Sequence, residues 1–291
     1  MTLPNLQDYH RPATAEEAIA LMQQHGEGAM LVAGGTFVHG LEVRGLLDSV
    51  TALIDIGRLG LGGISREGST IVLGATTTLA AVAAADFTSH EPAFGALRDA
   101  LTYPPPQIRN AGTIGGSVAA AAPLYDIPAA LLALGAVVRT TGPKGRRELP
   151  LDGFFRGLFE SALAPGEIIT GVAIPPAPAR TAGAFLKLET NANDLAIVSV
   201  ASQLTLDAAG RIAAVRIVLG GGVGETYVRA TGAEAALAGQ QADDKAFAAA
   251  AKAVGGDFEP VSDHRGSAAY RRHIAGVYVR RTLTTARERL G

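Results

Sequence analysis

Cysteine is absent from this chain of 291 residues. Without a thiol the chain can form no disulfide, no zinc–thiolate site, no cysteine-ligated iron–sulfur cluster and no thiol nucleophile of its own. The six histidines are scattered, and none stands in the HxxxH or HExxH spacing that places two imidazoles on one helix face. We therefore expect no metal site in this chain.

Long apolar runs are also missing, because no stretch approaches the roughly 20 residues of a membrane-spanning helix. The first residues, MTLPNLQDYHRPAT, lack the basic-then-apolar order of a signal peptide. The formal net charge of −2 gives no electrostatic reason to bind nucleic acid or an anionic membrane. We expect a cytoplasmic protein with neither nucleic acid nor membrane as a partner.

Apolar residues make up 48% of the sequence and charged residues 18%, so the chain can bury sizeable cores. Its length favours two domains over one. The segment PPAPARTAG at 175–183 is dense in proline and small residues without periodicity, which is typical of a linker. We expect one domain at residues 1–176 and a second at 177–291.

Hydrophobic periodicity and turn residues predict an α+β fold. In the first part, Thr14 and Glu17 form a capping box for a helix that ends at Gly26, and TGPKG joins two strands of a hairpin. In the second part, three strands precede three helices. The expected hairpin strands are 136–140 and 147–150, the second-part strands are 184–188, 196–206 and 211–219, and the helices are 231–238, 242–254 and a long one from Arg265.

Six arginines lie on the expected last helix, but no nucleic-acid-binding motif accompanies them. Apolar residues recur there at helical spacing and predict a buried face. The arginines would then lie on the solvent-exposed face or in a subunit contact. The predicted buried face is Tyr270, Ile274, Val277 and Tyr278, and the arginines are Arg271, Arg272, Arg280, Arg281, Arg287 and Arg289.

Two glycine pairs each follow a hydrophobic stretch of the first part: Gly34-Gly35 before Thr36, and Gly115-Gly116 after Thr113. Adjacent glycines permit positive φ and close approach, and successive backbone N–H groups can then hold phosphate oxygens. Neither pair fits the GxGxxG or the P-loop pattern, and one such turn alone is more often only a turn. Two of them, about eighty residues apart, suit a long ligand that contains a pyrophosphate.

Asp126 follows the second pair and is predicted to N-cap a helix that ends at Gly135. Ligand contact is an equally good explanation of this carboxylate. No GxSxG nucleophile motif is present, and His39 and Tyr103 are isolated candidates for acid–base work.

Four segments carry further patterns, in the same order as in a known family. They are AGGTFVHG (33–40), QIRNAGTIGGSVAAAAPLYDIPAALLALGA (107–136), FLKLETNANDLAIVSVA (185–201) and SDHRGSAAYRRHIAGVYVRRTL (262–283). Together they resemble the FAD-binding medium subunits of molybdenum hydroxylases, among them carbon monoxide dehydrogenase medium subunits and bacterial xanthine dehydrogenase FAD subunits.

This resemblance implies an FAD-binding domain of the vanillyl-alcohol-oxidase (PCMH) type, followed by a smaller flavoprotein C-terminal domain. FAD would lie extended, with its pyrophosphate at the two glycine turns, Asp126 on the ribose and adenine side, and Lys187 and Leu195 near the isoalloxazine. The cofactor-binding residues it implies are Ala33, Gly34, Gly35, Thr36, Phe37, Tyr103, Thr113, Ile114, Gly115, Gly116, Ser117, Asp126, Ile169, Lys187 and Leu195.

The chain departs from the family pattern in three places. Phe37 stands where Asp or Ser is usual, Ser117 where Asn is usual, and Thr190-Asn191-Ala192 where a basic residue is common. The first change removes a polar side chain, the second shortens a hydrogen-bonding one, and the third removes a charge near the flavin edge. All three leave the backbone turns in place.

The resemblance also implies a function as an oxidoreductase subunit with no catalytic residue of its own. A small partner subunit would carry two [2Fe–2S] clusters, a large molybdopterin subunit would hydroxylate the substrate, and the assembly would be a dimer of heterotrimers. Electrons would pass through FAD to NAD⁺, a quinone or O₂. A stand-alone FAD-dependent oxidoreductase and a scaffold without flavin are the alternatives, and the substrate could be carbon monoxide, a purine, an aldehyde or an N-heterocycle.

Overall fold

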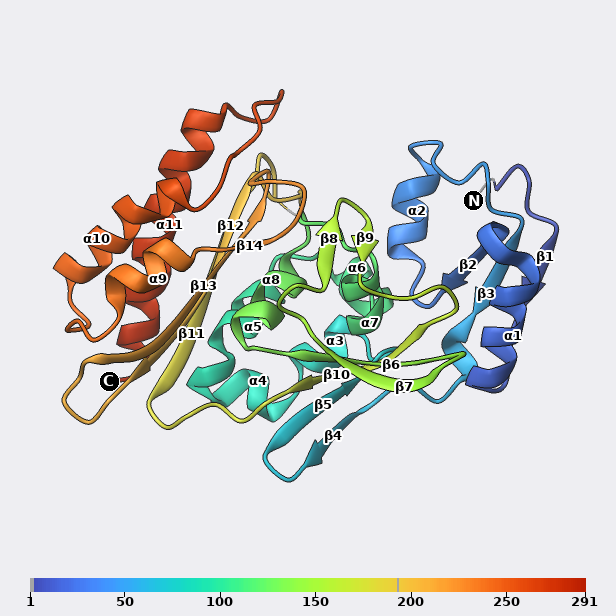
Figure 1. Cartoon of the computed structure of the whole chain (residues 1–291), viewed down its shortest axis with the longest axis horizontal. Coiled ribbons are helices and arrows are strands. Elements are labelled where there is room, and N and C mark those ends of the chain that lie inside the picture. The colour runs from blue at the N-terminus through green and yellow to red at the C-terminus, as the bar shows by residue number, and fades with distance from the viewer. Residues whose placement is uncertain (1–2, 193) are drawn as a thin grey trace.

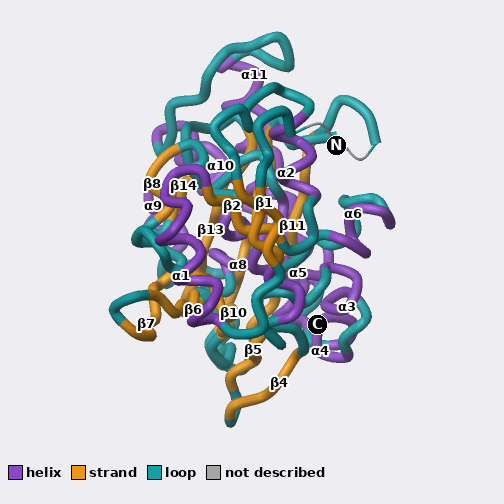
Figure 2. The backbone as a smooth tube through the Cα atoms, turned by 90° about the vertical axis from the view of Figure 1, so that its right-hand side faces the viewer, coloured by secondary structure: helices purple, strands orange, loops and turns teal. Residues whose placement is uncertain are grey.

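The computed structural model describes residues 3–192 and 194–291, which leaves Asn193 of the third family segment outside the described residues. Three sheets follow one another along the longest axis (Figure 1). The N-terminal sheet is parallel, with strand order β1-β3-β2. In Figure 2 the end of the molecule that carries this sheet faces the viewer. Its strands are β1 (Asp8–His10), β2 (Ala29–Val32) and β3 (Ala52–Asp55).

Helix α1 (Ala15–His25) connects β1 to β2 and confirms the predicted caps. The Thr14 hydroxyl accepts the N–H of Glu17 at 3.1 Å, and the Glu17 carboxylate accepts the N–H of Ala13 at 2.8 Å. In a capping box the Glu17 carboxylate would accept the N–H of Thr14 itself, so the bond to Ala13 lies one residue earlier than the motif prescribes. Gly26, at φ 53°, ends the helix as predicted.

The central sheet is antiparallel, with strand order β4-β5-β10-β6-β7. The predicted hairpin is confirmed, since Val137 pairs with Pro150 and Gly142 with Gly145. A small pair of strands lies beside it. The strands are β4 (Ile64–Glu67), β5 (Thr70–Gly74), β6 (Val137–Gly142), β7 (Gly145–Pro150), β8 (Phe155–Gly157), β9 (Glu160–Ser161) and β10 (Ile168–Ile174).

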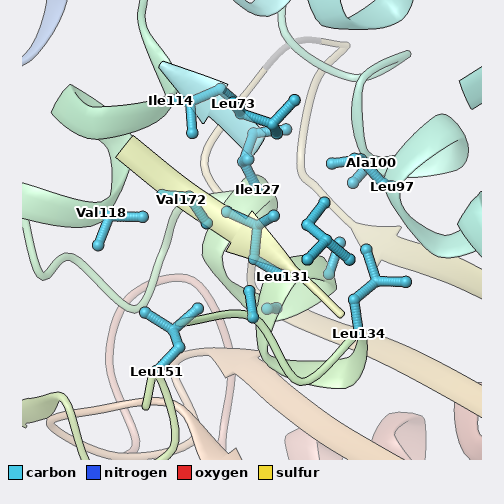
Figure 3. Close-up of a cluster of buried hydrophobic side chains, with 14 of the residues drawn as sticks. Leu73, Leu97, Ala100, Ile114, Val118, Ile127, Leu131, Leu134, Leu151 and Val172 are labelled. Carbon is cyan, nitrogen blue, oxygen red and sulfur yellow. The ribbon is translucent and has the colours of Figure 1, made fainter. Parts of the chain in front are cut away.

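Short helices connect and cover these two sheets. The side chains of Leu73, Ile114, Leu131 and Val172 meet in a buried cluster between the central sheet and helices α7 and α8 (Figure 3). This cluster fixes the second glycine turn, which opens α7, against the end of β5. The helices are α2 (Thr36–Glu42), α3 (Leu79–Ala83), α4 (Asp86–His90), α5 (Gly95–Ala100), α6 (Pro106–Ala111), α7 (Ile114–Ala119) and α8 (Asp126–Ala133).

The C-terminal sheet is antiparallel, with strand order β11-β12-β13-β14. Helices α9–α11 cover one face, and α5 and α8 of the preceding region contact the other (Figure 1). Every residue of β12 is consequently buried. The elements are β11 (Thr181–Leu188), β12 (Val198–Leu206), β13 (Ile212–Gly221), β14 (Val228–Arg229), α9 (Thr231–Leu237), α10 (Asp244–Ala253) and α11 (Ala268–Glu288), close to the predicted ones.

The largest buried cluster crosses from one region to the other, because Phe185, Val218 and Tyr227 pack into the core of the first. Polar contacts cross as well. The Arg289 guanidinium donates to both carboxylate oxygens of Asp99 at 2.8 Å, and Asp99 also accepts the N–H of Phe185. The two regions therefore share a core.

The predicted buried face of α11 is only partly right, because Ile274 and Tyr278 pack half-buried against the core whereas Tyr270 is exposed. Tyr270 is 45% exposed, and the buried residues of this helix include Arg271 and Ala275. Arg271 is 1% exposed because its guanidinium donates to the carbonyl oxygens of Gly222 and Val261 and to the Asp263 carboxylate. A buried arginine needs such partners, and sequence periodicity does not show them. Within the described ranges, no helix is long and apolar enough to cross a membrane.

Candidate functional site

A cleft made of two adjoining cavities lies where the two glycine turns meet. One, of about 230 Å³, is lined by residues of both regions and is called the interdomain cavity. The other, of about 200 Å³, is lined by the first region and is called the turn cavity. Thr36, Ser117 and Tyr125 line both, so they mark the junction. The cleft can take an elongated ligand.

The first glycine turn runs from the end of β2 to the start of α2 and lines the turn cavity with Ala33, Gly34, Gly35, Thr36 and Phe37. Gly35 has φ 70°, in the left-handed region. A Cβ on Gly34 would lie 1.8 Å from the carbonyl oxygen of Ala111, so Gly34 is needed for packing.

The first glycine turn has backbone N–H groups that are free to donate hydrogen bonds. Among the described residues, the N–H groups of Gly34, Gly35, Thr36 and Phe37 donate to no protein acceptor. Successive unpaired N–H groups in a turn that includes a left-handed residue suit an anion. The first turn can therefore hold phosphate oxygens with its backbone.

The second glycine turn differs, because its N–H groups already have acceptors. Ile114 donates to the carbonyl of Thr77, Gly115 to that of Ala75, and Gly116 to the hydroxyl of Thr113, at 2.8 to 3.1 Å. A Cβ on Gly115 would lie 2.7 Å from the Cβ of Ala75. Thr113, Gly116 and Ser117 line the turn cavity, whereas Ile114 and Gly115 lie behind its wall.

Asp126 is the first residue of α8, and its predicted capping role is wrong. The N-cap is Tyr125, and no side chain caps this helix end, whereas Gly135 at φ 69° does end the helix region as predicted. The Asp126 carboxylate points to Lys187 instead, whose Nζ donates to Oδ2 at 3.0 Å. Ion pairing with a residue of β11 has replaced the local cap.

The second carboxylate oxygen of Asp126, Oδ1, is buried and has no protein hydrogen-bond partner. Burial raises the pKa of Asp126 to about 6, and the charge of Lys187 opposes that rise. Because this residue lines the interdomain cavity, its free oxygen can accept a hydrogen bond from a ligand hydroxyl.

Lys187 is held from several sides and also lines the interdomain cavity. Its Nζ donates to the carbonyl of Asp194 at 2.8 Å, lies 3.0 Å from the Glu189 carboxylate, and lies 4.7 Å from the centre of the Tyr103 ring. The Tyr103 hydroxyl accepts the backbone N–H of Lys187 at 3.1 Å. Tyr103 thus positions Lys187, and burial raises the pKa of its phenol.

The 3.0 Å ion pair between Asp126 and Lys187 brings together two side chains to which the resemblance assigns different parts of FAD. Leu195 lines the same cavity, which groups these three residues at one end of the cleft.

The fourth family segment supports the loop that carries Leu195. Arg265 lies 2.7 Å from the carboxylate of Asp194, and this carboxylate accepts the N–H of Leu195 at 2.7 Å. The Arg265 guanidinium, with that N–H, holds the pKa of Asp194 below its usual range. Two segments that are seventy residues apart in sequence therefore build one wall of the interdomain cavity.

Tyr125 was missed by the sequence analysis although it lines both cavities. Its ring lies 6.1 Å from that of Phe37, which in turn lies 5.5 Å from that of Phe159. The Tyr227 hydroxyl contacts the carbonyl oxygens of Ala122 and Tyr125 and fixes this backbone. A lone aromatic among small residues, directly before Asp126, was the available signal.

Besides Ile114 and Gly115, three predicted residues line neither cavity: Tyr103, Ile169 and His39. Ile169 lies in β10, is 5% exposed, belongs to the main hydrophobic core and lines neither cavity. His39 is exposed, with its ring nitrogen 3.3 Å from the Glu42 carboxylate, and also lies outside both linings. Thr190, Asn191 and Ala192 are exposed.

Two family models match the chain. Residues 4–177 match the FAD binding domain in molybdopterin dehydrogenase, and residues 183–286 match the CO dehydrogenase flavoprotein C-terminal domain.

Individual relatives match over nearly the whole length. The chain is 35% identical to the carbon monoxide dehydrogenase medium chain of Afipia carboxidovorans, with 99% of each chain covered. It is also 35% identical to the 6-hydroxypseudooxynicotine dehydrogenase complex subunit alpha of Paenarthrobacter nicotinovorans, covering 97% of this chain and 95% of the relative. A solved carbon monoxide dehydrogenase from Hydrogenophaga pseudoflava superposes with a TM-score of 0.92 at 36% identity, covering 98% and 99%.

The cleft fits the cofactor that these matches imply. Free N–H groups at the first turn suit a pyrophosphate, the unpartnered Oδ1 of Asp126 suits a hydroxyl, and the apolar residues around them suit flat rings. The sequence signatures, the fold and this donor set agree. The chain belongs to the family of FAD-binding medium subunits of molybdopterin dehydrogenases and is a subunit of an oxidoreductase.

Proposed function

We propose that this chain is the FAD-containing electron-transfer subunit of a cytoplasmic molybdenum hydroxylase. In this proposal a small subunit with [2Fe–2S] clusters delivers electrons, a large molybdopterin subunit hydroxylates the substrate, and NAD⁺, a quinone or O₂ accepts the electrons from the flavin. The complex is a dimer of heterotrimers. The observation that carries the proposal is one cleft with an anion-binding turn and a free buried carboxylate oxygen, in a chain that matches medium subunits end to end.

The residues of the cleft have distinct parts in holding FAD. The N–H groups of Gly35 and Thr36 would hold pyrophosphate oxygens, and Oδ1 of Asp126 would accept a hydroxyl. The interdomain cavity, walled by Pro104, Ile108 and Leu195, would exclude water from the ring system. FAD itself supplies the capacity to take up electrons singly and pass on a pair.

Lys187 sets the electrostatics of this end of the cleft. Its ammonium is 3% exposed and contacts the carboxylates of Asp126 and Glu189. Pairing of a buried ammonium with carboxylates offsets its charge locally. The protein would thereby contribute position and electrostatics, while the cofactor supplies the electron chemistry.

The names of the relatives support a subunit in a larger assembly and leave the substrate open. One relative is a medium chain and another is a subunit of a complex, and they are named for carbon monoxide and for 6-hydroxypseudooxynicotine. Since similar chains serve different substrates, we place substrate choice in the large partner subunit.

The alternative, a stand-alone FAD-dependent oxidoreductase, needs an acid–base residue beside the flavin. His39 lies outside the cleft, and Tyr103 is engaged with the backbone of Lys187. Asp126, with its pKa of about 6, is the carboxyl that this alternative would have to use. A free chain that turned over a small molecule, with activity lost in Asp126→Asn, would favour the alternative.

Two measurements test the proposal. Heat-released flavin from the purified chain should chromatograph as FAD, and an extract that contains FMN alone would contradict the extended cleft. Native purification should bring down two further chains, with iron and molybdenum in the complex. An isolated chain that oxidises purines or aldehydes without partners would contradict the electron-transfer role.

A further inference from the structure

Two histidines and an aspartate come together on the N-terminal sheet, outside the cleft. Asp8 and His10 lie on β1, and His25 is the last residue of α1. The Nε2 atoms of the two imidazoles are 3.0 Å apart, with ring centres 4.9 Å apart and a tilt of 44°. One ligand atom from each of the three residues lies within 4.8 Å of the others.

The fold builds this cluster from positions that sequence spacing does not connect. Asp8 and His10 are two residues apart on a strand, so their side chains leave on the same side. Helix α1 returns the chain between β1 and β2 and brings His25 to that side. Tyr9, between them, faces elsewhere and donates its hydroxyl to the Asp55 carboxylate at 2.7 Å.

The cluster has free ligating capacity. The Asp8 carboxylate has no ion pair or hydrogen bond with any described residue. In the neutral histidine pair one Nε2 carries the proton and the other accepts it. Both can become acceptors if the donating ring moves its proton to Nδ1. An ion about 2.0–2.1 Å from each Nε2 would then lie beside the line that joins the two atoms.

We propose that His10, His25 and Asp8 form a binding site for a divalent transition-metal ion such as Zn²⁺. Two imidazoles and one carboxylate are a donor set that zinc accepts. Zinc–nitrogen distances of about 2.0–2.1 Å in a tetrahedral site place the ligand nitrogens about 3.3–3.4 Å apart, so the two Nε2 atoms, 3.0 Å apart here, need to separate only slightly. The chain has no cysteine to compete for the ion. Water completes the coordination.

Such an ion would join α1 to the edge strand β1. Because the three ligands are distant in the unfolded chain, the ion binds the folded form preferentially and raises its stability by mass action. The site would therefore stabilise the sheet whose strand β2 leads into the first glycine turn.

The test uses full-length protein without a histidine tag, carrying its flavin. Titration with ZnSO₄ in a calorimeter should show one site per chain. Loss of an outer-shell partner alone weakens metal sites about 10- to 100-fold, so His10→Ala and His25→Ala should weaken Zn²⁺ binding by more than about 100-fold, and Asp8→Asn by less. His90→Ala and His264→Ala, each removing an exposed histidine elsewhere, are matched controls and should bind normally.

A second measurement does not depend on the variants. Co²⁺ in the wild-type chain should give visible ligand-field bands that Zn²⁺ abolishes at one equivalent. Circular dichroism and flavin content establish that each variant is folded. Absent Zn²⁺ binding, binding unchanged in His10→Ala, or binding that falls equally in His90→Ala would each overturn the proposal.

Discussion

The two glycine turns look alike in sequence but offer the cleft different groups. At the first turn, the N–H groups from Gly34 to Phe37 have no protein acceptor among the described residues. At the second, the N–H groups of Ile114, Gly115 and Gly116 are used to fasten the turn to Thr77, Ala75 and Thr113. The N–H groups of the first turn are available to a ligand, whereas the second turn is a small wall fixed by its own hydrogen bonds.

The two glycines of each pair differ in how much space a Cβ would have. Gly34 and Gly115 sit where a Cβ would collide with backbone atoms, at 1.8 Å from Ala111 and 2.8 Å from Ala75. Gly34, Gly35 and Gly116 line the turn cavity, whereas Gly115 lies behind its wall. A repeated Gly-Gly pattern therefore marks one position whose Cβ would collide with the backbone and one whose Cβ would not.

Replacing the packed glycine should have the largest effect. Gly34→Ala forces a methyl group into the Ala111 carbonyl, and we expect the free energy of unfolding of the flavin-free chain to fall by about 3 kcal/mol or more. Gly35→Ala has space but a left-handed backbone, so a loss of about 1–2 kcal/mol is expected. Urea unfolding measures both, and equal losses would remove the distinction within the pair.

The free energy of unfolding should depend on pH through Asp126, whose side chain lies in the cleft near the second turn. Its pKa is raised from an ordinary value near 3.8 to about 6 in the folded chain. The folded state therefore binds more protons than the unfolded state between about pH 4 and pH 6. Stability from this group is present below pH 4 and is lost as the pH rises through 6, by up to about 3 kcal/mol.

Asp126→Asn should remove that dependence. The unfolding free energy of the variant minus that of the wild type should rise between pH 4 and pH 6.5, as measured by urea titrations of flavin-free protein. Asp86→Asn, at an exposed position, is the control. A difference that stays flat across this range would mean that burial does not perturb Asp126.

A bulky group at the junction of the two cavities should separate binding from folding. Ser117 lines both cavities. In Ser117→Phe we expect FAD affinity to fall at least about tenfold, which is about 1.4 kcal/mol, while the flavin-free chain keeps its unfolding midpoint. Ser89→Phe, on exposed α4, is the matched control. Fluorescence titration with FAD measures both, and undiminished affinity in Ser117→Phe would place the ligand elsewhere.

Phe37 should give the smallest effect. Phe37→Ser restores a side chain that is usual in the family but loses the ring contacts with Tyr125 and Phe159. Since an aromatic pair contributes about 0.5–1.5 kcal/mol, we expect a stability loss near 1 kcal/mol and an FAD affinity within a few fold of wild type. A large loss of affinity would show that the ring contacts FAD directly.

Local chemistry was predictable from the sequence, and long-range partners were not. Thr14, Gly26 and the hairpin at Gly142–Gly145 follow from rules about neighbouring residues. Asp126 was misread as a cap because its partner, Lys187, is 61 residues away in the sequence and reaches it only through the tertiary fold. The buried state of Arg271 likewise depends on carbonyl oxygens that no periodicity reveals.

At the site, too, local features were predictable from the sequence and long-range contacts were not. The family segments supplied the residues of both turns. Whether the N–H groups of the second turn are occupied depends on Ala75 and Thr77, which lie between β5 and α3 and which the glycine pattern does not indicate. Tyr125 and the histidine pair were missed for a related reason. Motif spacings describe residues on one element, and these residues meet across two or three.

The shared core has a consequence for synthesis of the protein. Asp99 is separated in sequence from Arg289 by 190 residues, and the cluster around Leu131 is completed by Phe185 and Val218. A nascent chain that has emerged only as far as the glycine turns therefore exposes an unfinished apolar surface until β11–β13 and α11 follow. The flavin-binding half should thus become resistant to protease late in translation, and we expect it to need its second half as an intramolecular chaperone.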